Sequence, residues 1–196
     1  MIKQVLSIAG SDSGGGAGIQ ADLKAMSANG VYAMSVITAI TAQNTEEVAD
    51  VFDLPTSIVA AQLDAIFDDF DVAAVKTGML SSAEIIQTVV KLLQPQQVKN
   101  LVVDPVMIAK GGQPLLKPDA IDTMKSALFP LALLVTPNVH EAQQLSGIEI
   151  ASLADARRAA KIIHQFGCAH VLIKGGHLQK ERGTDLLYDG RFFTIF

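Results

Sequence analysis

Polar, charged and glycine residues follow five apolar runs of this chain, and their types are those that could do chemistry. They are Gly10-Ser11-Asp12, Lys76-Thr77-Gly78-Met79, Asp104-Pro105-Val106, Thr136-Pro137-Asn138 with Glu141, and Lys174-Gly175-Gly176-His177. Carboxylates, amides and ammonium groups donate or accept hydrogen bonds and can hold charged or polar ligands. Any one of these groups is explained by ordinary turn chemistry. Five of them together favour a ligand-binding site.

Three consecutive glycines, Gly14 to Gly16, lie between the first apolar run and a segment of helical period. Glycine adopts backbone conformations that other residues avoid and lets a ligand approach the main chain closely. A P-loop would continue with Gly-Lys-Ser/Thr, whereas Ile19-Gln20 follows Gly18, and a dinucleotide loop counted from Gly14 would need glycine at position 19. The sequence therefore predicts a glycine-rich turn into a helix that packs against a small, flat ligand.

The composition bounds the class of protein. The 196 residues are 49% hydrophobic and 18% charged, with a net charge of -5, which fits one globular domain over 1–196. The acidic balance, the absence of Trp and the 5% of aromatic residues argue against a nucleic-acid partner. We expect no membrane span, because no apolar run reaches about 18 residues, and no signal peptide. Cys168 is the single cysteine, so we expect no disulfide framework, a small core side chain at this position and a cytoplasmic protein.

Short β-type runs alternate with longer segments of helical period, which predicts a mainly parallel sheet with crossover helices. The expected strands are 5–9, 35–39, 72–76, 101–103, 131–136 and 170–174. Ligands of open α/β sheets bind beyond the carboxyl ends of the strands, so the five polar groups should meet at one rim.

Helices should connect these strands. One ends at Asn29-Gly30, one follows Pro55 and buries Ile58, one begins with a Ser81/Glu84 capping box, and one spans about 152–166.

Several runs of the sequence resemble the hydroxymethylpyrimidine/phosphomethylpyrimidine kinases of thiamine biosynthesis. They are AGSDSGGGAGIQADLK, SVITAITAQNT, VKTGML, VVDPVM, VTPN with Glu141, and IKGGH. The resemblance covers essentially the whole chain in order and spacing. It implies a ribokinase-like α/β fold, a mainly parallel sheet with helices on both faces and a homodimer. It also implies transfer of the γ-phosphoryl group of ATP to 4-amino-5-hydroxymethyl-2-methylpyrimidine and then to its monophosphate.

The resemblance implies a substrate role for Gln43, in the run TAQNT. An amide offers both a donor and an acceptor, which suits the edge of an aminopyrimidine, where a ring nitrogen and an exocyclic amine alternate. On the same basis Asp22 is expected to position the pyrimidine, and Gly10, Met79 and Val106 to line its pocket.

Phosphoryl transfer needs charge neutralisation and positioning. Asp104 and Glu141 are therefore the predicted Mg²⁺ ligands, through water molecules in the way that Mg²⁺ often prefers. Asn138 should support them, while Lys174, Gly175 and Gly176 should bind ATP. Lys76 and His177 receive no role at this point.

Two other functions stay open. A pyridoxal-type vitamin kinase of the same superfamily would share VTPN with Glu141 and KGGH, and a non-catalytic module would bind the pyrimidine without turning it over. The kinases that this chain resembles extend beyond the strand pair at which this chain ends. Their later segment carries a Gly-Thr-Gly-Cys-type loop that forms the anion hole and supplies the catalytic residue. This chain has no such run and stops after a hairpin predicted at Asp189-Gly190, so we expect a truncated C-terminus. Turnover at least about a hundredfold below that of a longer chain is then expected.

Overall fold

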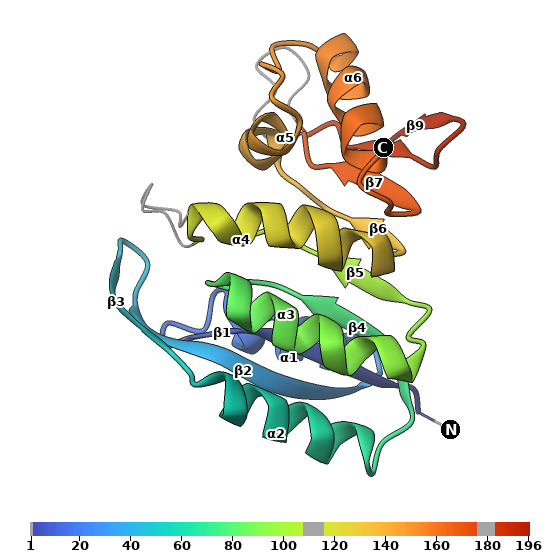
Figure 1. Ribbon diagram of the computed structural model, residues 1–196. Coiled ribbons are helices and arrows are strands. Elements are labelled where there is room, and N and C mark those ends of the chain that lie inside the picture. Colours follow the sequence, from blue (N-terminus) through green and yellow to red (C-terminus); the bar gives the residue numbers. More distant parts are fainter. Residues whose placement is uncertain (1, 108–115, 176–182) are drawn as a thin grey trace.

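The structure, a computed structural model, describes residues 2–107, 116–175 and 183–196, and its strands form one sheet in the order β3-β2-β1-β4-β5-β6-β7-β8-β9 (Figure 1). The strands are β1 (Gln4–Asp12), β2 (Tyr32–Gln43), β3 (Val48–Asp53), β4 (Val72–Thr77), β5 (Leu101–Val103), β6 (Leu134–Val135), β7 (His170–Ile173), β8 (Leu186–Tyr188) and β9 (Phe193–Ile195). Strand β1 lies between β2 and β4, so the loop that follows it lies near the carboxyl ends of both neighbours.

The centre of the sheet is parallel and its two margins are antiparallel. Strands β2, β1, β4, β5, β6 and β7 pair in parallel, whereas β3 runs antiparallel to β2, and β8 runs antiparallel to both β7 and β9. The mainly parallel α/β sheet is therefore confirmed, as is the hairpin at Asp189-Gly190. The strand expected at 131–136 is shortened to β6, because Phe129–Leu131 forms a 3₁₀ turn.

Strand β3 has no counterpart among the predicted strands. It is an edge strand, and its four central residues are exposed. Its sequence, VADVFD, also lacks the strict alternation of apolar and polar residues that marks a half-buried strand, so periodicity did not predict it.

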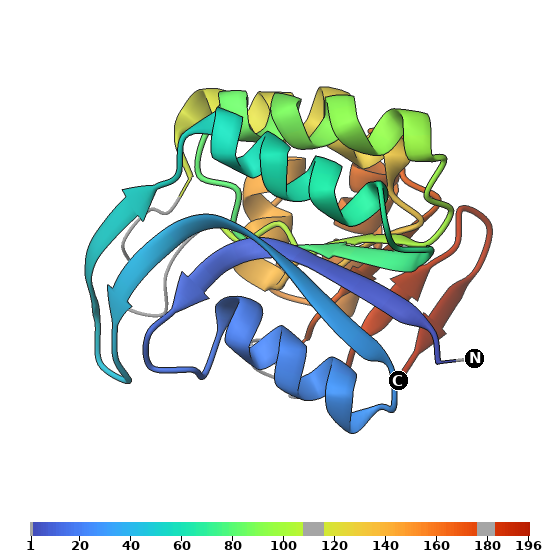
Figure 2. The same ribbon diagram turned by 90° about the horizontal axis from the view of Figure 1, so that it is seen from below.

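Helices cover both faces of the sheet, as expected. They are α1 (Gly18–Ala28), α2 (Thr56–Phe67), α3 (Ala83–Leu93), α4 (Pro118–Thr123), α5 (Val139–Ser146) and α6 (Leu153–His164). Helix α1 lies on one face, and α2, α3 and α4 lie on the other (Figure 2). None of the helices in the described ranges is long and apolar enough to cross a membrane.

Two local predictions for the helices are wrong. Helix α3 is capped by Ser82, whose Oγ accepts the N–H of Ile85, while Ser81 instead donates its hydroxyl proton to Asp53 at 2.6 Å.

The second correction concerns α2, where Ile58 is 49% exposed, and Val59 and Leu63 are the buried residues. Both errors are shifts of one position, because periodicity alone does not fix which residue faces the sheet.

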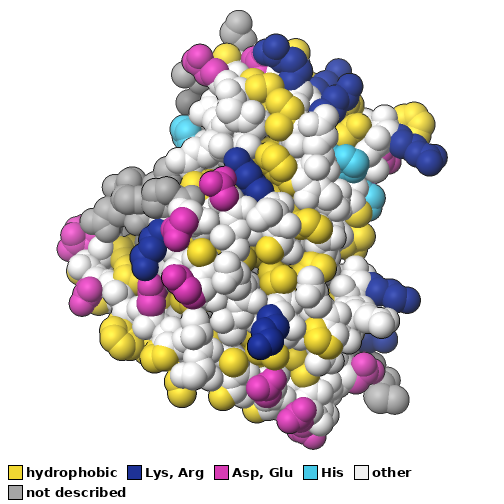
Figure 3. All heavy atoms as spheres, in the orientation of Figure 1, with side chains coloured by type: hydrophobic (Ala, Val, Ile, Leu, Met, Phe, Trp, Pro, Cys, Tyr) yellow, Lys and Arg dark blue, Asp and Glu magenta, His cyan; other side chains and the backbone are white. Residues whose placement is uncertain are grey.

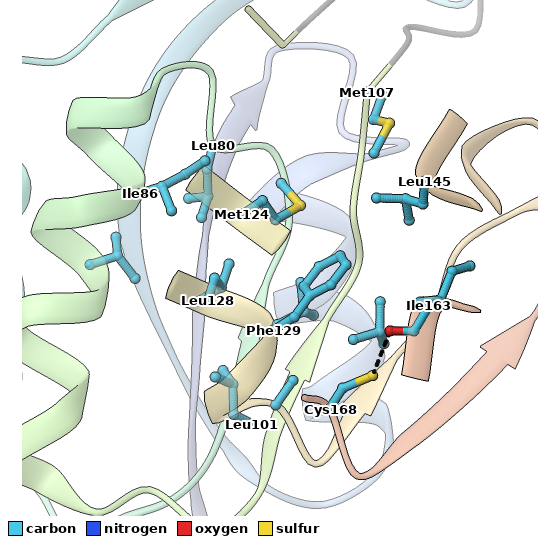
Figure 4. Packing of buried hydrophobic residues seen from close by; sticks show 14 of the residues in the cluster. Leu80, Ile86, Leu101, Met107, Met124, Leu128, Phe129, Leu145, Ile163 and Cys168 are labelled. Carbon is cyan, nitrogen blue, oxygen red and sulfur yellow. Dashed lines mark hydrogen bonds between the residues drawn. The ribbon is translucent and has the colours of Figure 1, made fainter. Parts of the chain in front are cut away.

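The hydrophobic core beneath α3 and α4 is built around Phe129 (Figure 4). Cys168 is buried in it, as expected of a small core residue, and its Sγ donates to the carbonyl oxygen of Ile163 at 3.7 Å. Burial raises the pKa of this thiol to about 11, so it stays protonated at neutral pH. This side chain is therefore structural.

Charged side chains of both signs share the face shown in Figure 3. Lys and Arg side chains gather at the top, over α6, which carries Arg157, Arg158 and Lys161. Asp and Glu side chains interrupt the basic ones over the rest of this face. This face therefore presents no broad basic surface among the residues described.

Candidate active site

A cavity of about 450 Å³ lies at the carboxyl ends of β1, β2 and β4. The five residues expected to contact the pyrimidine all line it, although they come from separate parts of the chain. They are Gly10, Asp22, Gln43, Met79 and Val106. The cavity has the size of a small-molecule site and lies where open α/β sheets bind their ligands.

The glycine loop on one wall of the cavity is organised by Asp12, at the end of β1. The Asp12 carboxylate is buried and accepts three backbone N–H groups, from Gly14 at 2.8 Å, Gly16 at 2.9 Å and Ala17 at 2.8 Å. Gln20, on the first turn of α1, accepts the backbone N–H of Asp12 at 2.8 Å. The loop is thus tied to both the strand before it and the helix after it.

These contacts explain why the glycine triplet is not a phosphate loop. Backbone N–H groups that precede a helix form a ready site for an anion. Here the chain's own carboxylate occupies them. Asp12 was missed as a site residue, although an Asp two residues before a glycine run is a turn-forming signal that could have indicated it.

Gly18 has a positive φ of 55°, and a Cβ at this position would collide with the carbonyl oxygen of Gly10. A Cβ at Gly10 would lie only 2.7 Å from Cε of Met79, one of the apolar residues that line the cavity. These two glycines therefore let the loop, β1 and Met79 approach closely enough to shape the cavity.

Gln43 is the last residue of β2, and its main chain and side chain are both held. Ser13 bridges its backbone, donating to the carbonyl oxygen at 2.7 Å and accepting from the N–H at 2.8 Å. Oγ1 of Thr41 lies 3.2 Å from Oε1 of Gln43 and shares its single hydroxyl proton with the carbonyl oxygen of Ser11, which is nearer at 2.9 Å. Within the described residues the amide Nε2 has no acceptor, so its two N–H donors are available to a ligand.

Asn44, next in the chain, is a turn residue. Its Oδ1 accepts the backbone N–H groups of Glu46 at 2.8 Å and Glu47 at 2.9 Å. The run TAQNT therefore contributes one cavity amide and one amide that builds the β2–β3 turn.

Asp22 faces two partners that the sequence did not assign. Ser7 donates to Oδ2 at 2.6 Å, and Lys76 forms an ion pair with the same carboxylate at 2.8 Å. Asp22 and Lys76 both line the cavity. Asp22 is therefore part of a cluster and not an isolated acceptor.

The residues expected to handle ATP and Mg²⁺ lie at the neighbouring strand ends. Lys174 pairs with Asp104 at 2.8 Å, and Asp104 also lines the cavity. Asn138 and Lys174 form an isolated bridge between the segments after β6 and β7. The N–H of Gly175 donates to Asp185 at 2.9 Å. Gly176 and His177 lie outside the described residues.

Glu141 and Asn138 form a capping box at the start of α5. Asn138 Oδ1 accepts the N–H of Glu141 at 2.9 Å, and Glu141 Oε2 accepts the N–H of Asn138 at 2.8 Å. Burial raises the pKa of Glu141, and the negative charge of Asp104 adds to this against the lowering effects of the Asn138 N–H and of Lys174. The buried carboxylate thus has a structural role in the fold itself.

The raised pKa of Glu141 predicts a pH dependence of stability. The protonated carboxyl is favoured in the folded state, so its contribution is full below the ordinary pKa of 4.5 and is lost as the pH rises through the higher folded-state pKa. We expect Glu141→Gln, which keeps an oxygen for the Asn138 N–H, to remove this loss. Urea titrations across that pH window should show the unmodified chain losing stability relative to Glu141→Gln as the pH rises. The exposed Glu149→Gln is the control, and a difference independent of pH would contradict the assignment.

The carboxylate oxygens of Asp104, which follows β5, fit a hydrated Mg²⁺ ion. Oδ1 of Asp104 is engaged by Lys174, while Oδ2 has no hydrogen-bond partner among the described residues. The described residues contain no group of three or more His, Cys, Asp or Glu that would enclose a metal ion by itself. Mg²⁺ commonly needs only one or two carboxylates when substrate phosphates and water complete its shell.

Comparison with known proteins identifies the family. The phosphomethylpyrimidine kinase family matches residues 12–196 of this chain. A hydroxymethylpyrimidine/phosphomethylpyrimidine kinase of Rhizobium meliloti is 55% identical over 97% of this chain and 71% of its own length.

Solved structures agree on the fold. A phosphomethylpyrimidine kinase of Clostridium difficile superposes with a TM-score of 0.91 at 50% identity, over 99% of this chain and 84% of that one. A pyridoxal kinase of Staphylococcus aureus in complex with pyridoxal gives a TM-score of 0.90 at 40% identity, over 100% of this chain and 71% of that one.

The relatives are longer than the chain described. It spans 39% of the thiamine biosynthesis bifunctional protein ThiED of Geobacter sulfurreducens, to which it is 50% identical over 98% of its own length. Its match nevertheless extends from the glycine loop to its last residue. This chain belongs to the phosphomethylpyrimidine kinase family and has its ribokinase-like α/β fold.

Proposed function

We propose that this chain transfers the γ-phosphoryl group of ATP to the hydroxymethyl oxygen of 4-amino-5-hydroxymethyl-2-methylpyrimidine, and then phosphorylates the monophosphate to the diphosphate. In each step a P–O bond forms to the acceptor oxygen while the bond between the γ-phosphorus and ADP breaks; the hydroxymethyl oxygen loses its proton in the first step, and an anionic phosphate oxygen is the acceptor in the second. The observation that carries the proposal is the cavity in which all five expected pyrimidine residues meet. Family membership supports the same chemistry.

The cavity lining suits a flat heterocycle with one polar edge. Met79 and Val106 provide apolar contact, and Gly10 leaves the main chain accessible. The Nε2 donors of Gln43 lack a described acceptor, and its Oε1 has only the 3.2 Å contact with Thr41, whose hydroxyl is nearer to Ser11. An alternating donor and acceptor edge on the ligand would satisfy this amide.

The nucleotide and its Mg²⁺ would be bound by Asp104, Lys174 and the residues at the start of α5. The Lys174 ammonium would neutralise phosphate oxygens, and Asp104 would hold Mg²⁺ through its free oxygen or through water. Glu141 would be the second Mg²⁺ ligand, through water at the start of α5, and Asn138 would support it. When bound, Mg²⁺ would offset the negative charge of the phosphates. The residues themselves contribute position and charge, which is what this reaction mainly requires.

A first test of the substrate site is Gln43→Leu. The substitution removes both the donors and the acceptor of the amide and leaves a polar ligand edge without a partner. We expect pyrimidine binding to weaken by about 1–2 kcal/mol. Isothermal calorimetry measures this, with the exposed Gln87→Leu on α3 as the matched control. Equal affinities of Gln43→Leu and the unmodified chain would remove Gln43 from the site.

A pyridoxal kinase is the second candidate, because pyridoxal kinase structures superpose on this chain as well as the pyrimidine kinase does. Competition between pyridoxal and the aminopyrimidine, in binding and in turnover, separates the two. A clear preference for pyridoxal would overturn the proposal. Tight pyrimidine binding by the full natural protein without any ATP consumption would instead indicate a non-catalytic binding module.

We also propose a cytoplasmic homodimer. Ile40 and Phe52 are directly opposite each other on β2 and β3 and are 50% and 64% exposed, so they form an apolar pair at the sheet edge. A second copy of the chain would cover this pair. A single cysteine, already buried, is compatible with a reducing compartment.

Phe52→Lys tests the dimer. A charge at this position would have to be buried without a partner in the dimer but would remain solvated in a monomer. We expect sedimentation velocity to show a shift from dimer to monomer at micromolar concentration. The control is Ile2→Lys, at an exposed apolar residue just before β1. A monomeric unmodified chain, or a variant that stays dimeric, would contradict this interface.

A further inference from the structure

Ser7, Lys76 and Asp22 form a polar cluster on the wall of the cavity. Ser7 Oγ donates to Asp22 Oδ2 at 2.6 Å, and Nζ of Lys76 lies 3.0 Å from Oδ1 and 2.8 Å from Oδ2. Both oxygens of one carboxylate are therefore engaged by residues of the sheet. Neither Ser7 nor Lys76 is among the residues to which the proposed function gives a role.

The sheet brings the two donors together. Ser7 on β1 and Lys76 on β4 are register partners in a parallel pair, so their side chains leave the same face of the sheet. Helix α1 covers this face and carries Asp22 in its second turn. Ser7 is fully buried, and the Lys76 and Asp22 side chains are only 22% and 18% exposed. The ion pair is thus largely removed from water, where geometry matters more than in a surface pair.

Gly78 makes room for the ammonium group. A Cβ at this position would lie 3.0 Å from Nζ of Lys76 and 2.9 Å from Cβ of Ala9. The missing side chain at Gly78 therefore leaves the space in which the ammonium meets the Asp22 carboxylate. Lys76 is engaged with both oxygens of Asp22 and can hold this carboxylate in place.

We propose that Ser7 and Lys76 are positioning residues that fix the Asp22 carboxylate in one orientation at the cavity wall. Oδ2 receives two donors and Oδ1 receives one, so Oδ1 keeps lone-pair capacity for a further donor. A ligand with an N–H group, such as the exocyclic amine of an aminopyrimidine, would use it. The identity of this ligand rests on the proposed function, whereas the positioning of Asp22 does not.

Chemical rescue at position 76 tests the role of the ammonium. Lys76→Cys is alkylated either with 2-bromoethylamine, which displaces bromide and forms a thioether analogue of lysine, or with iodoacetamide, which gives a neutral side chain of similar length. Cys168 is buried and its thiol pKa is raised to about 11, so mass spectrometry should show a single adduct. We expect Lys76→Cys to bind 4-amino-5-hydroxymethyl-2-methylpyrimidine about tenfold more weakly. Aminoethylation should restore the affinity to within about threefold, and the neutral adduct should not. Equal affinities of the two adducts would overturn the proposal.

A double-mutant cycle shows whether Lys76 acts through Asp22. In an Asp22→Asn background, Lys76→Cys should cost less than about twofold in affinity, because the group that it positions is already altered. Ser7→Ala, which leaves the ion pair in place, should weaken binding by about threefold alone and by almost nothing in the same background. Fully additive losses would mean that Lys76 and Ser7 act independently of Asp22.

Crystal structures of the two alkylated forms and of Ser7→Ala provide a readout without any ligand. The contact of Asp22 with Ser7 should persist in the aminoethylated form and be lost in the neutral one. An unmoved carboxylate in both forms would overturn the positioning role even if the pyrimidine binds. The unmodified chain could fail to bind the pyrimidine while Asp22 keeps its contact with Ser7 in the aminoethylated form and loses it in the neutral one. In that case the proposed function fails and the positioning role stands. If Lys76→Cys does not fold, the position of the Asp22 carboxylate in Ser7→Ala is compared with that in the unmodified chain instead.

Discussion

Asp12→Ala is expected to lower the free energy of unfolding by about 2–4 kcal/mol and to abolish measurable pyrimidine binding. Three backbone N–H groups, those of Gly14, Gly16 and Ala17, lose their charged acceptor together. Hydrogen bonds to charged groups contribute more than neutral ones, and water replaces them only in part. The loop that forms one wall of the cavity would then lose the contact that orders its glycines.

A graded series makes this prediction sharp. Asp12→Asn keeps one acceptor oxygen and can retain the bonds from Gly16 and Ala17, so it should cost only about 1 kcal/mol and weaken binding partially. Asp69→Ala, at an exposed carboxylate after α2, is the control and should change neither quantity. Urea unfolding and calorimetry measure the two effects. If Asp12→Ala unfolds like the unmodified chain and binds the pyrimidine equally well, the loop does not depend on Asp12.

Asp104→Asn is expected to weaken ATP binding in the presence of Mg²⁺ by about 10- to 100-fold while pyrimidine affinity stays within about threefold. The substitution removes the charge that pairs with Lys174 and the free oxygen that we assign to Mg²⁺. Side-chain volume is almost unchanged, so the cavity wall should keep its shape. Without Mg²⁺ the sign should reverse, because one negative charge fewer faces the phosphates and Lys174 is released to them.

This sign reversal separates a metal role from a structural one. Fluorescence titrations with an ATP analogue, with and without Mg²⁺, measure it, and Asp119→Asn at an exposed site on α4 is the control. Equal losses of nucleotide and pyrimidine affinity would show that Asp104 shapes the fold. A loss independent of Mg²⁺ would leave Asp104 as the partner of Lys174 alone.

Local sequence determined much of the architecture. Alternating β-type and helical runs indicated the parallel sheet, and the Asp189-Gly190 turn indicated the β8–β9 hairpin, in which Gly190 has a φ of 89°. The carboxyl ends of parallel strands share one edge, so the positions of Gly10, Met79 and Val106 after their strands were enough to predict a common rim, whereas Gln43 lies beyond its expected strand and was assigned only by the family resemblance. These features depend on short-range periodicity and turn chemistry, which a single sequence contains.

Only the tertiary structure decided which polar groups pair. Lys76 lies 54 positions from Asp22, and Lys174 lies 70 positions from Asp104, yet each pair is in direct contact. The first pairing exists because β1 and β4 are neighbours in register and α1 covers their shared face; the second exists because the carboxyl ends of β5 and β7 flank that of β6. Strand order and register follow from the packing of the whole sheet, and local periodicity does not encode them. For the same reason the sequence pointed to Asp22 as an isolated substrate residue, and the fold placed it between Ser7 and Lys76.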